Sequence, residues 1–140
     1  MLPSDISTPP RPRHDPAALS PAALDFLATR HLATLTTLRP DGTPHDVPVG
    51  FTWDPDRRLA RVISSGSSRK ARNAAAGCRA VLCQVDGRHW LALEGPARVL
   101  TSPAEVREAE QRYAVRYRPP RVNPERVVIA VEVDRVLGNL

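Results

Sequence analysis

The sequence Ser64-Ser-Gly-Ser-Ser-Arg-Lys-Ala-Arg-Asn73 (SSGSSRKARN) decides how the surrounding chain folds. It follows a largely apolar run, Arg58–Ile63 (RLARVI), which is typical of a strand. It leads into an alanine-rich run, Arg69–Ala76, that stops before Gly77, as a helix would. The stretch therefore predicts a strand, a turn of small residues and the start of a helix.

The start of this predicted helix is a candidate phosphate site. The first N–H groups of a helix have no partner within it, and the helix dipole favours an anion there. The surrounding residues are Ser64, Ser65, Gly66, Ser67, Ser68, Arg69, Lys70 and Arg72. Neither GxxxxGK[ST] nor GxGxxG is present, so a serine-capped helix with a solvated basic face remains the alternative interpretation.

Length and charge limit the possible functions. The chain has 140 residues, which suits one domain, and a formal net charge of +5. Seven basic residues and no acidic one lie between Asp56 and Asp86, and four arginines and no acidic residue lie between Glu110 and Glu125. Such a field attracts polyanions, either nucleic acid or an anionic cofactor or substrate. Because only 4% of residues are aromatic, a stacking platform for nucleic acid is disfavoured.

The chain shows neither a signal segment nor an apolar run of membrane-spanning length, so we expect a cytoplasmic protein with no membrane contact. Residues 1–16 are rich in Pro, Ser and Asp and predict a flexible N-terminal tail, which leaves residues 17–140 as the folded domain.

The remaining pattern predicts a mainly β fold with peripheral helices. Strands are expected over His31–Leu38, Thr43–Trp53, Leu59–Ser64, Cys78–Val85, His89–Leu100 and Arg126–Val136. Helices are expected from Pro21 to about Arg30, over Arg69–Ala76, and from Pro103 to about Tyr117. Six mostly antiparallel strands in a chain this short favour a small β-barrel.

Two prolines mark one of these strands. Pro44 and Pro48 lie inside Thr43–Trp53, and proline cannot donate to a strand ladder. The strand should therefore be at an edge, carry a bulge, or face a ligand at that position. The long strand His89–Leu100 should bend at Gly95-Pro96.

Several motifs, together with this order of elements, resemble a known family. They are HLATLTTL (residues 31–38), DGTPH (41–45), VGF (49–51), SSRKARN (67–73) and WLALEGPAR (90–98). The chain resembles the split β-barrels of the pyridoxamine-phosphate-oxidase superfamily, and within them the bacterial branch that uses the deazaflavin coenzyme F420. The resemblance covers nearly everything from Leu24 to Leu137.

This resemblance implies a homodimer with two equivalent cofactor sites between the subunits. It implies that Ser64, Ser65, Lys70 and Asn73 hold the coenzyme phosphate. Pro48 and Val49 would lie against the deazaflavin ring, and Trp90 would reach the cofactor from the other subunit. The anionic oligoglutamate tail of the coenzyme would suit the two acid-free arginine stretches.

The implied activity is hydride transfer from reduced F420 to a conjugated acceptor, with biliverdin the expected substrate. The cofactor carries the chemistry, so no catalytic side chain and no metal is expected. Arg116, Arg118 and Arg121 are candidates for binding the substrate propionates, the alternative being a solvated basic helix end and loop. The other readings are FMN as cofactor, a quinone-like acceptor, or a non-catalytic module that binds cofactor or haem.

Overall fold

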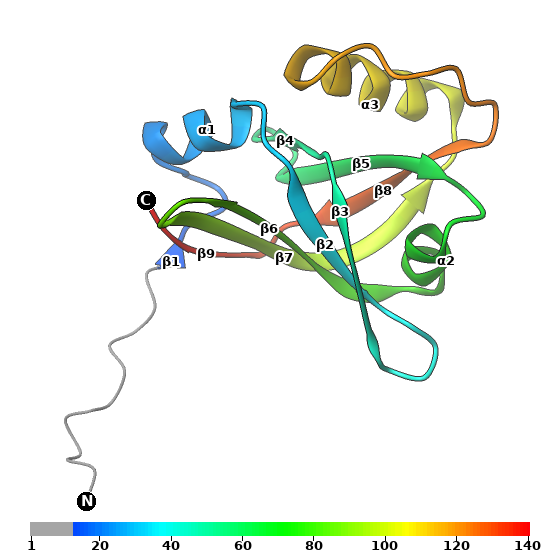
Figure 1. Cartoon of the computed structure of the whole chain (residues 1–140), viewed down its shortest axis with the longest axis horizontal. Coiled ribbons are helices and arrows are strands. Elements are labelled where there is room, and N and C mark those ends of the chain that lie inside the picture. Colours follow the sequence, from blue (N-terminus) through cyan, green and yellow to red (C-terminus); the bar gives the residue numbers. More distant parts are fainter. Residues whose placement is uncertain (1–12) are drawn as a thin grey trace, which may run out of the picture.

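Strands dominate the structure. The computed structural model describes residues 13–140, where one antiparallel sheet of nine strands is accompanied by three helices (Figure 1). The strands are β1 (Arg13–His14), β2 (Ala33–Leu38), β3 (Pro44–Val49), β4 (Thr52–Asp54), β5 (Leu59–Ser65), β6 (Cys78–Asp86), β7 (His89–Leu100), β8 (Arg126–Glu132) and β9 (Arg135–Asn139). The helices are α1 (Pro21–Ala28), α2 (Arg69–Ala76) and α3 (Pro103–Arg116).

The two edges of the main sheet are joined by a very short connection. The strand order is β3-β2-β6-β7-β8-β5-β4, with β9 pairing with β7 and β1 pairing with β9. Only Gly50 and Phe51 separate β3 from β4, although these strands stand at opposite ends of that order. The three Cα–Cα steps from Val49 to Thr52 span at most about 11 Å, so the sheet must be rolled enough to bring these two strand ends close together, although β3 and β4 do not pair. The predicted mainly β split barrel with three helices is thereby confirmed.

The strand count differs because two predicted strands are interrupted and because Arg13 and His14 form a further strand, β1. The predicted strand Thr43–Trp53 breaks at Phe51. There the backbone N–H bonds to a side chain and not to a neighbouring strand: the Phe51 N–H donates to Oη of Tyr117, the residue that caps the end of α3, at 3.1 Å. The predicted strand Arg126–Val136 breaks at Val133 and Asp134, whose N–H groups donate to Arg58 O and Glu94 O, each at 2.9 Å. The first break changes the partner strand from β2 to β5, whereas the second replaces β5 by β1 and keeps β7 as a partner on both sides of the break.

The predicted bend in the long strand coincides with a change of partner. β7 pairs with β9 up to Glu94 and with β8 from Ala97 onward. Between them, a β-carbon on Gly95 would overlap the carbonyl oxygen of Glu132. Glycine is therefore needed where the backbone of β8 crosses close to β7.

The helix boundaries follow local capping signals, as predicted. Ser20, Ser68 and Ser102 each accept a backbone N–H three residues on, at the starts of α1, α2 and α3 respectively. Gly77 ends α2 with φ of 84°, which glycine adopts without strain. As Figure 1 shows, α2 lies at one end of the rolled sheet, whereas α1 and α3 lie along one side of it.

The edge prediction for the proline-containing strand is confirmed, since β3 pairs only with β2. The tail boundary needs a correction: Arg13 and His14 pair with Leu137 and Val136 of β9. The rest of the predicted tail, residues 1–12, lies outside the described residues. Over residues 13–140, no helix is long and apolar enough to cross a membrane.

The hydrophobic core fills the inside of the rolled sheet. Its largest fully buried side chains are Phe51, Leu27, Leu35, Leu59, Leu82, Leu91, Leu93 and Ile129. Leu27 comes from α1 and the rest come from the sheet and from the β3–β4 connection.

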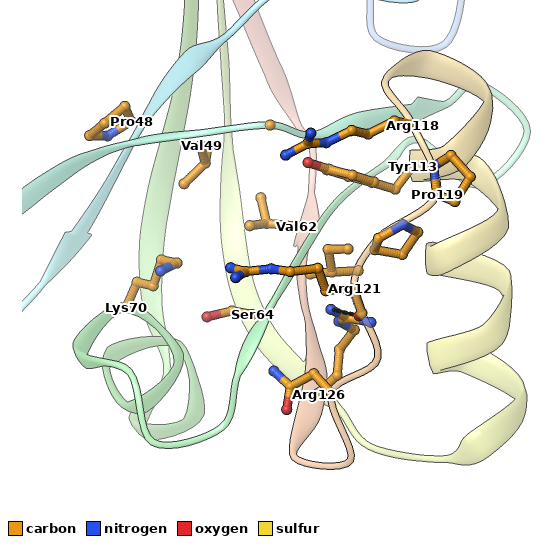
Figure 2. A pocket seen from close by; sticks show the side chains of 14 residues that line it. Pro48, Val49, Val62, Ser64, Lys70, Tyr113, Arg118, Pro119, Arg121 and Arg126 are labelled. Carbon is orange, nitrogen blue, oxygen red and sulfur yellow. Dashed lines mark hydrogen bonds between the residues drawn. The ribbon is translucent and has the colours of Figure 1, made fainter.

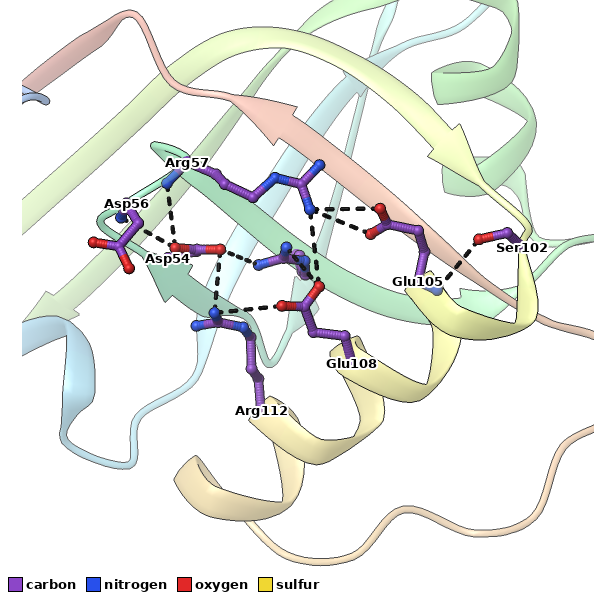
Figure 3. Close-up of polar contacts among 8 residues, drawn as sticks. Asp54, Asp56, Arg57, Ser102, Glu105, Glu108 and Arg112 are labelled. Carbon is purple, nitrogen blue, oxygen red and sulfur yellow. Dashed lines mark hydrogen bonds and ion pairs between the residues drawn. The ribbon is translucent and has the colours of Figure 1, made fainter.

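An ion-pair network fastens α3 to the β4–β5 hairpin (Figure 3). Asp54 and Arg61 are each 2% exposed, and Arg61 Nη1 donates to Asp54 Oδ2 at 2.9 Å. Two α3 side chains contact this buried pair: Arg112 lies 3.2 Å from the same Asp54 oxygen, and Glu108 accepts from Arg61 Nη2 at 3.2 Å. This network sets the position of α3, whose far end borders the cavity described next.

Candidate cofactor site

A cavity of about 450 Å³ opens where β3, β5, α2 and the end of α3 come together (Figure 2). The residues that line it are Pro48, Val49, Gly50, Val62, Ile63, Ser64, Lys70, Tyr113, Arg118, Pro119, Pro120, Arg121, Asn123 and Arg126. Six of these were predicted from the sequence to bind cofactor or substrate, namely Pro48, Val49, Ser64, Lys70, Arg118 and Arg121. The structure therefore brings both predicted groups into one cavity.

The start of α2 has the predicted strand–turn–helix form. The Ser68 hydroxyl accepts from Ala71 N (3.2 Å) and lies 2.8 Å from the Ser64 hydroxyl, so the two serines are linked. The N–H of Arg72 donates to Ser68 O at 3.0 Å, which leaves the N–H groups of Arg69 and Lys70 without a helical acceptor. An anion in the cavity could accept from them.

Other residues of the turn have different roles. The Ser65 hydroxyl accepts from Asn123 Nδ2 at 2.9 Å, and the Gly66 N–H donates to Glu125 O at 3.0 Å. These two residues thus fasten the loop after α3. Ser67 and Arg69 are exposed and do not line the cavity.

Asn73 does not face the cavity, which corrects its predicted role as a phosphate ligand. The side chain is buried, and its Nδ2 donates to Thr37 Oγ1 at 3.0 Å. Asn73 is on the side of α2 that packs on the sheet and ties the helix to β2.

Part of the cavity wall is apolar (Figure 2). Pro48 and Val49 end the edge strand β3, and Val62 of β5 lies across from them. Trp90 does not line this cavity: it pairs with Val85 in the β6–β7 hairpin, at the end of the molecule opposite α2 (Figure 1). Its predicted contact with the cofactor requires a second subunit.

Basic side chains line the wall formed by the loop after α3. Arg126 donates to Glu110 Oε2 (2.6 Å) and to the carbonyl of Arg121 (2.7 Å), so its charge is paired and it fixes the loop. Lys70, Arg118 and Arg121 have no acidic partner within 4.0 Å among residues 13–140. The cavity therefore carries an uncompensated positive charge.

Arg116 is a structural residue, so its predicted role in substrate binding is wrong. It is 8% exposed and donates to Thr29 O (3.0 and 3.1 Å), to Phe51 O (2.6 Å) and to Gln84 Oε1 (2.5 Å). Its guanidinium also lies over the Phe51 ring, 4.8 Å from the centroid. Burial lowers the pKa of Arg116, with Tyr117 opposing that shift.

Among the lining residues that the sequence did not predict, three have polar side chains: Tyr113, Asn123 and Arg126. Tyr113 has the helical spacing of a residue packed on the sheet, which hid its contact with the cavity. Arg126 directly follows the acid-free segment that ends at Glu125, and this proximity was the available signal. Within the described part of the chain, no cluster of three or more His, Cys, Asp or Glu residues could hold a metal.

The rolled sheet and its short β3–β4 connection define a split-barrel protein, and its cavity is lined by the serine turn and by cations without acidic partners in the described chain. A family model described as pyridoxamine 5'-phosphate oxidase matches residues 19–139, and the chain belongs to this family. The chain is also 60% identical over 121 residues to a protein of Mycobacterium tuberculosis named F420H2-dependent biliverdin reductase. That match covers 86% of this chain and 88% of the relative.

Solved structures show the same fold at lower identity. A conserved hypothetical protein of Mycobacterium tuberculosis superimposes with a TM-score of 0.74 at 20% identity, covering 91% of this chain and 88% of that one. The Group A Streptococcus protein HupZ superimposes with a TM-score of 0.70 at 17% identity, covering 86% and 94%. These two likenesses concern the fold alone.

Proposed function

We propose that this protein is an F420H2-dependent reductase that transfers a hydride from the reduced deazaflavin to biliverdin and forms bilirubin. The observation that carries this proposal is the 60% identity, over most of both chains, to the mycobacterial enzyme named for that activity. A match of 121 residues in a chain of 140 includes parts of the chain that form both walls of the cavity.

The described residues fit an elongated anionic cofactor. Ser64, Lys70 and the unpaired N–H groups at the start of α2 suit a phosphate, which favours charge-assisted hydrogen bonds. Pro48 and Val49 suit the flat face of a ring. When bound, F420 supplies the hydride; the protein residues bind it, orient it and keep water from the apolar end.

The substrate would use the opposite wall of the same cavity. Arg118 and Arg121 project into it without acidic partners, so they can bind the two propionates of biliverdin. Arg126 does not bind the substrate in this proposal; it holds the carbonyl of Arg121 and thereby positions that residue.

A homodimer completes the proposed site. Trp90 is half-buried and pairs with the exposed Val85, so the β6–β7 hairpin presents apolar surface away from the cavity of its own chain. A second copy could cover that surface and bring its Trp90 to the cofactor. Light scattering measures the oligomeric state directly. The cytoplasmic location remains a prediction.

Removal of the Lys70 charge is expected to weaken F420 binding by at least tenfold, about 1.4 kcal/mol. The Lys70→Ala change deletes the cavity's only lysine, whereas Arg69→Ala removes an exposed charge from the same turn and serves as the matched control. Fluorescence titration with F420 measures both dissociation constants. An unchanged value for Lys70→Ala would remove this residue from the site.

Neutralising Arg118 or Arg121 is expected to raise the biliverdin dissociation constant about tenfold each, because hydrogen bonds to charged groups contribute about 1.5–3 kcal/mol. Arg118→Gln and Arg121→Gln are compared with Arg107→Gln, which changes an exposed arginine of α3 outside the cavity. Visible-absorption titration with biliverdin gives the affinities. Equal affinities in all three variants would contradict the proposed substrate wall.

The activity itself is tested by mixing protein, F420H2 and biliverdin and following reoxidation of the coenzyme. No reoxidation with biliverdin or with quinones would contradict an enzymatic role. Tight F420 binding without turnover would instead indicate a carrier or storage module. A parallel titration with FMN separates the two cofactors, and tighter binding of FMN would reverse the assignment.

A further inference from the structure

Reduction of a conjugated tetrapyrrole requires a proton as well as a hydride, and the cavity offers few sources for it. None of the residues that line it in the described chain is an Asp, Glu, His or Cys. The remaining side chains with polar hydrogens are Ser64, Lys70, Tyr113, Asn123 and the three arginines. Arginine is not deprotonated in proteins, and an amide is no proton donor at neutral pH.

Position removes two of the three remaining candidates. Ser64 is engaged with Ser68 at 2.8 Å, and Lys70 projects from α2 beside Ser64, where the phosphate is proposed to bind. Tyr113 projects from the opposite side of the cavity, from α3, and its hydroxyl points toward β3, the strand that carries Pro48 and Val49 (Figure 2). Tyr113 therefore faces the end of the cavity where the ring and the acceptor should meet.

The hydrogen bonding of the Tyr113 hydroxyl differs from that of Tyr117, which lies four residues later and caps the end of α3. The Tyr117 hydroxyl is occupied, since it donates to His31 O at 2.7 Å and accepts from the Phe51 N–H at 3.1 Å. The Tyr113 hydroxyl has no hydrogen-bond partner among residues 13–140, yet its ring is held against Tyr117, with centroids 4.8 Å apart. The ring is fixed and the hydroxyl is free.

Gly50 makes room for this arrangement. A β-carbon at Gly50 would lie 3.0 Å from Tyr117 Cζ and 3.3 Å from Tyr113 Cε2, closer than ordinary packing allows. The absence of a side chain lets both tyrosine rings approach the backbone directly after Val49. The Tyr113 phenol is consequently part of the cavity wall next to the proposed ring position.

We propose that the Tyr113 hydroxyl donates the proton that biliverdin takes up when it is reduced, an inference that rests on the proposed function. The bridging carbon of biliverdin gains a hydride from the reduced coenzyme, and the displaced electron pair moves through the conjugated system to a pyrrole nitrogen. That nitrogen takes the Tyr113 proton as the O–H bond breaks. Water at the mouth of the cavity returns a proton to the phenolate, with Arg118 nearby on the same wall to stabilise its charge.

The test compares Tyr113→Phe with the wild type and with Tyr117→Phe. General acid catalysis typically contributes a factor of 10² or more. We therefore expect Tyr113→Phe to slow single-turnover reduction of biliverdin about a hundredfold, with F420 affinity unchanged within about twofold. Without coenzyme, the variant should bind biliverdin about threefold to tenfold more weakly, because one hydrogen bond to the substrate is lost. Tyr117→Phe should lower the melting temperature but leave the rate nearly unchanged in the folded enzyme.

The arms of the experiment separate the two claims. A wild-type enzyme that reoxidises no F420H2 with biliverdin defeats the proposed function and the proton donor together. Normal wild-type turnover with a Tyr113→Phe rate within threefold of it defeats only the role of Tyr113. An identical biliverdin affinity in wild type and Tyr113→Phe also overturns it, as does a slow rate accompanied by an equal loss of F420 binding.

Discussion

Replacement of Arg116 by methionine is expected to destabilise the fold by about 3 kcal/mol and to lower the melting temperature by roughly 10 °C. Methionine fills similar space, but Thr29 O and Gln84 Oε1 lose their only donors within residues 13–140. A buried acceptor left unpaired costs about 1–3 kcal/mol. Phe51 O also loses its Arg116 donor at 2.6 Å, and the Tyr117 hydroxyl, 3.2 Å away, can replace that donor only by giving up its bond to His31 O.

The contrast with an exposed arginine makes this prediction specific. Arg107 is on the same helix and exposed, so Arg107→Met should change the free energy of unfolding by less than about 0.5 kcal/mol. Chemical denaturation of both variants measures the difference. Equal stabilities would show that the buried guanidinium contributes little, and would reopen a role for Arg116 outside the core.

Asp54→Asn is expected to destabilise the protein by a similar amount, about 3 kcal/mol. The substitution leaves the Arg61 guanidinium, whose side chain is 1% exposed, with only the partly exposed Glu108 as a charged partner. Removal of one partner from a buried ion pair typically costs about 3–5 kcal/mol. Asp134→Asn is the control: its bidentate pair with Arg79 is exposed and should contribute far less.

The pH dependence of the same variant gives a second measurement. Burial alone would raise the pKa of Asp54, but hydrogen bonds from Arg61 and the Arg57 backbone, with the charge of Arg112, outweigh it and lower the pKa below 3.8. A lowered carboxyl pKa stabilises the folded state above the unfolded pKa, and this contribution is lost as the pH falls through the folded value. The stability gap between wild type and Asp54→Asn should therefore shrink below about pH 4.

Local signals were enough to predict the element that carries the proposed phosphate site. The Ser68 cap, the alanine run and Gly77 act within a few residues, and α2 has the predicted bounds. The edge position of β3 was one of the three explanations that its two prolines allowed. The fold class could be predicted because these local elements permit few arrangements in a short chain.

The direction in which a side chain points could not be predicted so well. Arg116 and Arg118 are two residues apart, yet one is bound by core carbonyls and the other lines the cavity. Asn73 was expected beside Lys70, but its amide is buried and donates to Thr37 of β2 instead of facing the cavity. Such outcomes depend on neighbours that are distant in sequence, which composition and spacing do not encode.

The central place of β8 in the strand order has a consequence for biosynthesis. β8 separates β7 from β5, so the β4–β5 hairpin has no strand beside it until residues 126–132 leave the ribosome. Pairing between β5 and β8 spans segments more than 60 residues apart, as in Ser65 with Arg126, and such long-range closure slows folding. Until then the edge of β5 that β8 covers in the folded protein stays unpaired, and this edge is the surface that a chaperone would most need to shield.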